Sequence, residues 1–224
     1  MNQQIELKLG NKSWALTYEN LAIIVLSILY LVGIVGISIP IHPDFALLTP
    51  LNLLFSLATV LYFHPNWNRD SLLFLILCFG IGYGAEVFGV HTGLLFGSYE
   101  YGPVLGPKIL ETPLMIGINW ILLAYSSGML INQLLPKQNK VIKAASAALV
   151  MVGLDIFIEP VAIKYDFWQW EGRTTPPLQN FFGWWLVAFI VLLFFTFLLK
   201  KQKNKVAIAL LALQFIFFIA LNLL

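Results

Sequence analysis

The sequence has little charge and almost no cysteine. Only 11% of its 224 residues are Asp, Glu, Lys or Arg, whereas a soluble domain carries about 25%. The single cysteine, Cys78, leaves no possibility of a disulfide framework, and we interpret it as a packing residue. The formal net charge of +2 gives no indication of nucleic-acid binding. These deficits exclude a disulfide-rich scaffold and argue against a soluble domain.

Several catalytic signatures are also missing. The sequence shows no Ser or Cys triad and no Gly-rich phosphate-binding loop, and its last apolar run has no Lys that could bind retinal as a Schiff base. No metal is expected, because the spacing of the nearest candidate ligands matches no known metal site. Those four candidates are Glu86, His91, Asp155 and Glu159.

Long apolar runs take the place of these features. Hydrophobic residues make up 59% of the chain, and the mean hydropathy is +0.84. Each of seven runs is long enough to cross roughly 30 Å of hydrocarbon as a helix. We therefore predict an all-α polytopic membrane protein that forms one domain over residues 1–224. The predicted spans are 20–40, 44–63, 70–90, 112–134, 141–162, 179–199 and 206–223.

Basic residues are divided unequally between the two ends of the predicted spans. Ten lie on the side of the amino terminus, and three, Lys108, Lys164 and Arg173, lie on the other side. The positive-inside rule then places the amino terminus in the cytoplasm and the carboxyl terminus outside. We expect a multi-pass protein of the cell (inner) membrane, surrounded by the lipid bilayer.

Three carboxyl residues interrupt the apolar runs. Glu86 lies near the outer end of the third run. Asp155 and Glu159 lie in the fifth run, four residues apart, so they occupy one face of a helix one turn apart. Carboxyls within a membrane span are costly and mark functional sites by default. Because Gly82 and Gly89 share the face of Glu86, another backbone or a ligand could approach that carboxyl closely.

Aromatic residues follow the acids in an order that suggests an internal repeat. In both halves an acid is followed by an aromatic pair, a Pro-Leu step, and a Trp seven residues after the Pro. We predict a parallel repeat of residues 70–134 and 141–199 about an axis along the membrane normal, with the acids facing one cavity near the outer surface. Any single aromatic residue could instead be an interface anchor. The candidate substrate-binding residues are Tyr99, Tyr101, Trp120, Trp168, Trp170, Trp184, Asn119 and Asn180.

Carboxyls gathered in a site of low dielectric constant are suited to acid catalysis. Burial and like-charged neighbours disfavour ionisation, which leaves a neutral acid beside a carboxylate. Such a pair can protonate an alkene and then accept a proton from attacking water. Aromatic faces stabilise the intermediate cation by about 0.5–2 kcal/mol each. The residues alone therefore predict acid chemistry on an apolar substrate that forms a cation.

Four motifs then carry a family resemblance. They are GAEVFGVHTGLLFGSYEYGPVLGPKI, TPLMIGINW, GLDIFIEPVAIKYDFWQWEG and PPLQNFFGWW, within residues 70–190. In order and spacing they resemble the membrane carotenoid biosynthesis protein family, which includes the γ-carotene and bisanhydrobacterioruberin hydratases. The resemblance implies a carotenoid hydratase without a redox cofactor. Such an enzyme adds water across the terminal double bond of an acyclic ψ end group and forms a tertiary alcohol.

The resemblance also suggests roles for the candidate residues. Asp155 is the expected proton donor, and Glu159 or Glu86 is expected to orient and deprotonate the water. Asn119 and Asn180 are expected to hold that water, and the aromatic residues to enclose the end group. The expected partners are an apolar polyene, with lycopene and γ-carotene as candidates, and water. Other carotenoid-pathway enzymes are further candidate partners.

Two other functions remain open at this point. A lycopene-cyclase-type enzyme would use the same protonation and quench the cation with an internal double bond. A non-catalytic carotenoid-binding or transport protein would need the aromatic residues without the acid chemistry. In each case the polyene is expected to enter laterally from the bilayer, past Gly82 and Gly89.

Overall fold

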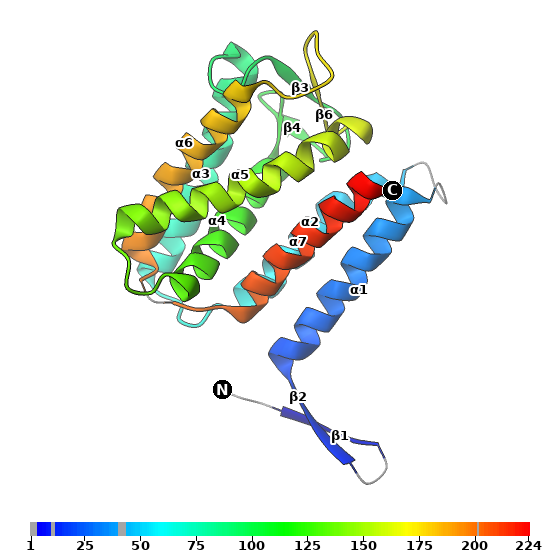
Figure 1. The fold of residues 1–224 in the computed structure, drawn as a ribbon, viewed down its shortest axis with the longest axis vertical. Coiled ribbons are helices and arrows are strands. Elements are labelled where there is room, and N and C mark those ends of the chain that lie inside the picture. The colour runs from blue at the N-terminus through cyan, green and yellow to red at the C-terminus, as the bar shows by residue number, and fades with distance from the viewer. Residues whose placement is uncertain (1–3, 10–11, 40–43, 201) are drawn as a thin grey trace.

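The computed structural model describes residues 4–9, 12–39, 44–200 and 202–224 (Figure 1). Within these residues seven helical segments are long and apolar enough to cross a membrane, which confirms the predicted all-α polytopic class. Their described ends agree with the predicted spans to within two residues. The helices are α1 (Tyr18–Ser38), α2 (Thr49–Tyr62), α3 (Arg69–Thr92), α4 (Leu114–Leu134), α5 (Lys140–Lys164), α6 (Leu178–Leu198) and α7 (Lys205–Leu223). A 3-10 turn, η1 (Phe45–Leu48), precedes α2.

Polar side chains fix where several of these helices begin. The Asn68, Asn139 and Asn204 side chains accept hydrogen bonds from backbone N–H groups in the first turns of α3, α5 and α7. These bonds satisfy donors that a helix amino terminus otherwise leaves unpaired. Pro113 and Pro177 stand directly before α4 and α6. The helix boundaries are therefore set by local chemistry that the sequence displays.

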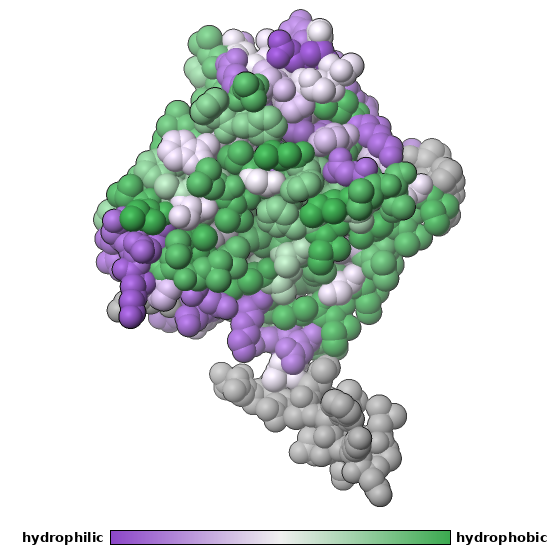
Figure 2. Space-filling model, viewed as in Figure 1, coloured by the Kyte–Doolittle hydropathy of each residue, from purple (hydrophilic) through white to green (hydrophobic). Residues whose placement is uncertain are grey.

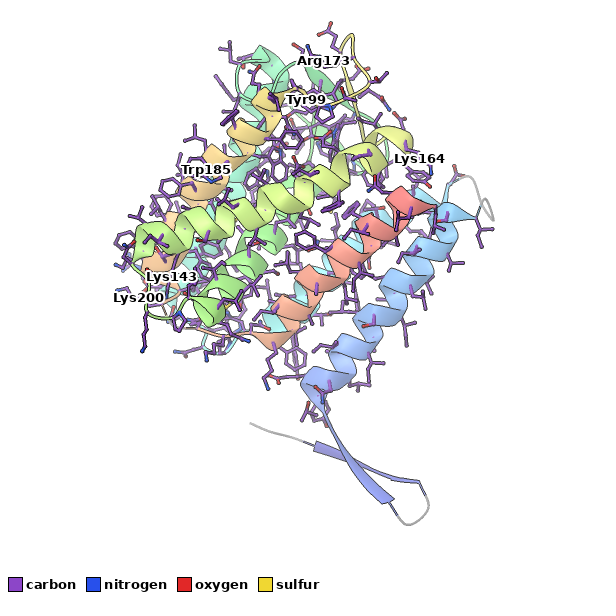
Figure 3. All side chains as sticks on the ribbon, viewed as in Figure 1. Tyr99, Lys143, Lys164, Arg173, Trp185 and Lys200 are labelled. Carbon is purple, nitrogen blue, oxygen red and sulfur yellow. The ribbon has the colours of Figure 1, made fainter. Side chains whose placement is uncertain are left out.

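The surface has the zonation of a membrane protein. In Figure 2 a broad apolar belt lies between hydrophilic bands at the two ends of the helices. Lys143 and Lys200 lie at one end, and Lys164 and Arg173 lie at the other (Figure 3). The basic residues thus separate as the orientation argument requires, with Lys201 outside the described residues. Which end faces the cytoplasm stays a prediction.

The helices form two groups with α4 between them. One group contains α3, α4, α5 and α6, and the other contains α1, α2 and α7 (Figure 1). Helix α4 is the most buried span and contacts α2, α3, α5, α6 and α7. The four-helix group carries all three membrane carboxyls, because Glu86 lies on α3 and both Asp155 and Glu159 lie on α5.

Short strands join the loops above the four-helix group. Strand β3 (Tyr99–Tyr101) pairs antiparallel with β6 (Trp168–Trp170), so that Tyr99 lies opposite Trp170 and Tyr101 opposite Trp168. Gly102 continues this pairing, and a Cβ at that position would clash with the Asp166 carbonyl. The two aromatic pairs of the sequence are therefore neighbours in space.

Two further strand pairs lie elsewhere. Strands β4 (Lys108–Ile109) and β5 (Thr112–Pro113) form a small hairpin before α4. Strands β1 (Gln4–Leu9) and β2 (Lys12–Thr17) form a hairpin before α1. None of these strands belonged to the sequence-based expectation of an all-α protein, and β5 lies where the fourth span, 112–134, was predicted to begin.

Candidate active site

The three carboxyls meet inside the four-helix group, directly below the β3–β6 pair. Glu86, Asp155 and Glu159 are each at most 2% exposed. A cavity of about 20 Å³ lies against Glu86 and Glu159, which is room for about one water molecule. All eight predicted substrate-binding residues line this cavity, together with Ile116 and Ile158. The structure thus brings together the residues that the sequence singled out.

Glu86 is held by three donors. The hydroxyl groups of Tyr99 and Tyr101 donate to Glu86 Oε2 at 2.6 and 2.8 Å. The indole N–H of Trp120 donates to Oε1 at 3.1 Å. Both oxygens of this carboxyl therefore have partners, and its side chain has a fixed position in the cavity wall.

The two tyrosines respond electrostatically to this carboxyl. Burial, followed by the charge of Glu86, raises the pKa of the Tyr99 and Tyr101 hydroxyls well above the usual value of 10. Both groups remain neutral hydrogen-bond donors at physiological pH, because ionising them beside a carboxylate in a buried loop is costly.

Glu159 has a matching set of donors. The indole N–H groups of Trp168 and Trp170 donate to Glu159 Oε2 at 3.2 and 2.8 Å. The Asn180 amide donates to Oε1 at 3.0 Å. As with Glu86, one oxygen accepts from the aromatic pair of the adjacent loop and the other accepts from the following helix. The Asp155–Glu159 helix turn therefore faces the same aromatic enclosure as Glu86.

Asp155 lies behind this cavity wall. It is completely buried and is not among the residues that line the cavity. Its Oδ2 accepts from the Asn180 amide at 3.0 Å, and its Oδ1 has no hydrogen-bond partner among the described residues. Asn180 thus connects Asp155 to Glu159. The carboxyls of Asp155, Glu159 and Glu86 are close enough for their charges to interact.

The aromatic residues form one continuous enclosure. The Trp120 and Trp184 rings stack with centroids 4.7 Å apart and an interplanar angle of 23°. Across the strand pair, the Tyr99 and Trp170 rings lie 5.1 Å apart. Apart from the N–H and O–H groups already engaged by the carboxyls, this enclosure offers π faces. It is suited to a hydrocarbon or to a developing positive charge.

The glycines beside Glu86 serve packing and do not open a path for a ligand. A Cβ at Gly82 would clash with the Trp120 ring, and one at Gly89 would press against the Phe96 ring. Close approach was correctly predicted, but aromatic side chains fill the space. Lateral entry past these two glycines is therefore wrong for this structure.

His91 does not join the acids. Its Nδ1 contacts the Val87 carbonyl at 2.8 Å, and its Nε2 lies 3.9 Å from Glu111 at the surface. Within the described residues, no three His, Cys, Asp or Glu side chains are arranged to hold a metal ion. The sequence did not single out two apolar cavity residues, Ile116 and Ile158. Ile116 lies four residues before Trp120 on one helix face, which was the available signal, whereas Ile158 directly precedes Glu159 and has no such spacing from it.

Comparisons with known proteins bear on the same region. The bisanhydrobacterioruberin hydratase of Haloarcula japonica is 28% identical over 138 residues, which is 59% of this chain and 47% of that protein. The chain therefore matches about half the length of that relative. No solved structure matches the chain. The family described as carotenoid biosynthesis protein matches residues 48–224, which include every residue of the acid cavity. The chain therefore belongs to the carotenoid biosynthesis protein family.

Proposed function

We propose that this protein is a carotenoid hydratase, which adds water to the terminal double bond of an acyclic ψ end group. The observation that carries the proposal is the pair of buried carboxyls, Glu86 and Glu159, on a cavity with room for about one water molecule. The family and the hydratase relative support the carotenoid substrate class.

The Asp155–Glu159 pair supplies the proton in this mechanism. Asp155 is the source of the proton, and Glu159 carries it to the alkene because Glu159 lines the cavity while Asp155 lies behind it. The proton adds to one alkene carbon and leaves a tertiary cation on the other. The aromatic faces and the remaining carboxylates stabilise this cation.

Water completes the reaction. Glu86 orients the water by accepting a hydrogen bond from it, and the water oxygen attacks the tertiary cation. The resulting oxonium ion returns a proton to the Asp155–Glu159 pair, with Glu159 as the base. The alkene has then gained one water, and the protein regains its initial protonation.

The size of the cavity favours hydration over cyclisation. A cyclase must fold the end of the polyene onto itself beside the acid, which requires a space that accepts several carbon atoms. A cavity of about 20 Å³ accepts a water molecule and leaves the hydrocarbon at its edge.

The symmetry and surroundings of the site complete the proposal. We propose that residues 70–134 and 141–199 are the two copies of a parallel repeat, because their acids, aromatic pairs and tryptophans meet across the β3–β6 pair. The protein would lie in the cell (inner) membrane with its amino terminus in the cytoplasm. Both aromatic loops would then lie at the outer side, where an end group in the outer leaflet reaches them.

The test is to express the protein in bacteria that make lycopene or γ-carotene, and to measure pigment masses. Wild-type protein is expected to add the mass of one water to the pigment, and the Asp155→Asn variant is expected to add none. Immunoblotting of membranes checks that both proteins are present in equal amounts. An isomer of unchanged mass would identify a cyclase. Unchanged pigment with normal expression in both hosts would contradict the hydratase proposal.

A further inference from the structure

A second, much larger cavity lies within the group of α1, α2 and α7, and Asn119 and Phe167 of the other group border it. It has a volume of about 560 Å³ and is lined by α1, η1, α2 and α7, within the about 300–1,000 Å³ that is usual for small-molecule sites. No charged residue is among the side chains that line it. We call it the lateral groove. It belongs neither to the acid cavity nor to the glycine face of α3.

The lateral groove faces the hydrocarbon belt at one side. Its lining residues Val32, Leu48 and Leu51 are 50%, 50% and 64% exposed, and all three lie on helical segments of the membrane-spanning part. An apolar molecule dissolved in the bilayer can therefore contact the groove without crossing a polar layer.

The opposite side of the lateral groove reaches the acid cavity. Asn119 lines both cavities. Phe167 lines the groove, and its neighbour Trp168 lines the acid cavity, with the two rings 6.4 Å apart. A chain lying in the groove would thus bring its end to the wall of the water-sized cavity that carries Glu159.

Polar side chains from three helices meet at one wall of the lateral groove. The Tyr30 hydroxyl of α1 lies beside Asn52 and Ser56 of α2 and beside Gln214 of α7. Ser56 Oγ and Gln214 Oε1 have no hydrogen-bond partner among the described residues. This wall therefore brings polar groups from α1, α2 and α7 side by side within the span region.

We propose that the lateral groove binds the polyene chain of the substrate, which enters from the bilayer between α1 and α2 and presents its terminal double bond at Asn119. This inference rests on the proposed function for the identity of the substrate. The acid cavity has room for the water, and the groove has room for the chain. The reacting carbon therefore lies at their junction, and the length of the chain is recognised far from the acids.

The test introduces bulk into the groove and measures bound lycopene as well as product. Leu29→Trp fills the lateral groove, and Leu31→Trp makes the same change on the same helix at a residue that is 60% exposed and does not line it. Leu48→Trp is a second groove variant at a half-exposed position, which decides the matter if Leu29→Trp fails to fold. Each protein is purified from lycopene-producing cells, checked by thermal unfolding, and assayed for retained lycopene.

The expected result is a loss of retained lycopene and of product by at least about tenfold in both groove variants, with Leu31→Trp within about twofold of wild type. The inference would be overturned if the groove variants retained as much lycopene and formed as much product as Leu31→Trp. The groove would then be assigned to membrane lipid. If lycopene is retained in a groove-dependent way and no water is added, the groove stands and the hydratase proposal fails. If wild type forms product but loses pigment during purification, product formation in the three variants decides.

Discussion

The two halves of the acid site share a plan and differ in one carboxyl. Glu86 and Glu159 each accept from an aromatic pair at one oxygen and from the following helix at the other. Only the second half contains a further acid, Asp155, which has an oxygen without a partner among the described residues. Glu86 has a partner on each oxygen and no second acid beside it, so it is a fixed acceptor, whereas the Asp155–Glu159 pair includes an unpartnered oxygen and can hold and release a proton.

The difference arises at two positions of the shared plan. Asp155 lies four residues before Glu159. The corresponding position, four residues before Glu86, is Gly82, which has no side chain and so leaves room for the Trp120 ring. Four residues before Trp184 stands Asn180, and four before Trp120 stands Ile116. In the first half the Trp120 ring therefore fills the space that Asp155 and the Asn180 amide occupy in the second half. From this difference we propose that Glu86 positions the water and that the Asp155–Glu159 pair transfers the proton.

The largest expected effect separates the two acids. Asp155→Asn should lower hydration by at least about 100-fold, because a general acid contributes about 10²–10⁴-fold. Glu86→Gln should lower it only about tenfold, the equivalent of one lost orienting hydrogen bond. Product formation by membranes containing equal amounts of each variant measures both. A larger loss from Glu86→Gln than from Asp155→Asn would reverse the assignment of the two halves.

A smaller effect tests the packing that replaces the missing acid. Gly82→Ala should destabilise the protein by about 1–3 kcal/mol, because the new Cβ would overlap the Trp120 ring. Gly84→Ala on the same helix is the matched control, since nothing lies within 4 Å of a Cβ there. Thermal or denaturant unfolding in detergent measures the difference. Equal stability of the two variants would show that Trp120 can move away from α3.

The smallest expected effect is a loss of folding stability at alkaline pH. It distinguishes the tyrosine donors of Glu86 from the tryptophan donors of Glu159. Burial and the charge of Glu86 raise the pKa of Tyr101 well above 10 in the folded protein, whereas an unfolded tyrosine ionises near 10. Its contribution to stability is therefore complete below about pH 10 and is lost as pH rises further. The loss approaches about 1.4 kcal/mol per pH unit.

Comparison of variants isolates this contribution from other alkaline titrations. Above pH 10, the free energy of unfolding of Tyr101→Phe should fall less steeply than that of wild type. That of Trp168→Phe should fall as in wild type, because indole does not titrate in this range. The free energy of unfolding is measured over a pH series in detergent. Parallel curves for wild type and Tyr101→Phe would mean that the Tyr101 hydroxyl is not buried beside Glu86 in solution, because burial is the first cause of its raised pKa.

Much of the arrangement could be predicted because it depends on local sequence. The membrane spans follow from hydrophobic length, since a backbone in hydrocarbon must satisfy its hydrogen bonds within a helix. The Asp155–Glu159 face follows from helical spacing. The aromatic residues that line the cavity were identified because polar and aromatic residues are conspicuous beside acids in an apolar sequence.

Other features depend on contacts between distant segments. The pairing of Tyr101 with Trp168 joins loops that are far apart in the chain. The sequence analysis predicted no pairing of β1 (Gln4–Leu9) with β2 (Lys12–Thr17), because a strand pair depends on two segments at once. For Gly82 the sequence predicts that another group comes close to the helix at this position. It does not predict that this group is the Trp120 ring.

The sequence by itself determined the membrane class, the seven spans and the shared helix face of Asp155 and Glu159, because hydrophobic length and helical period are properties of single segments. Only the tertiary structure decided that Glu159 faces the water-sized cavity while Asp155 lies behind it, and that the lateral groove opens between α1, α2 and α7. Those features are spaces, and a space is defined by side chains from several helices whose mutual packing no single segment encodes.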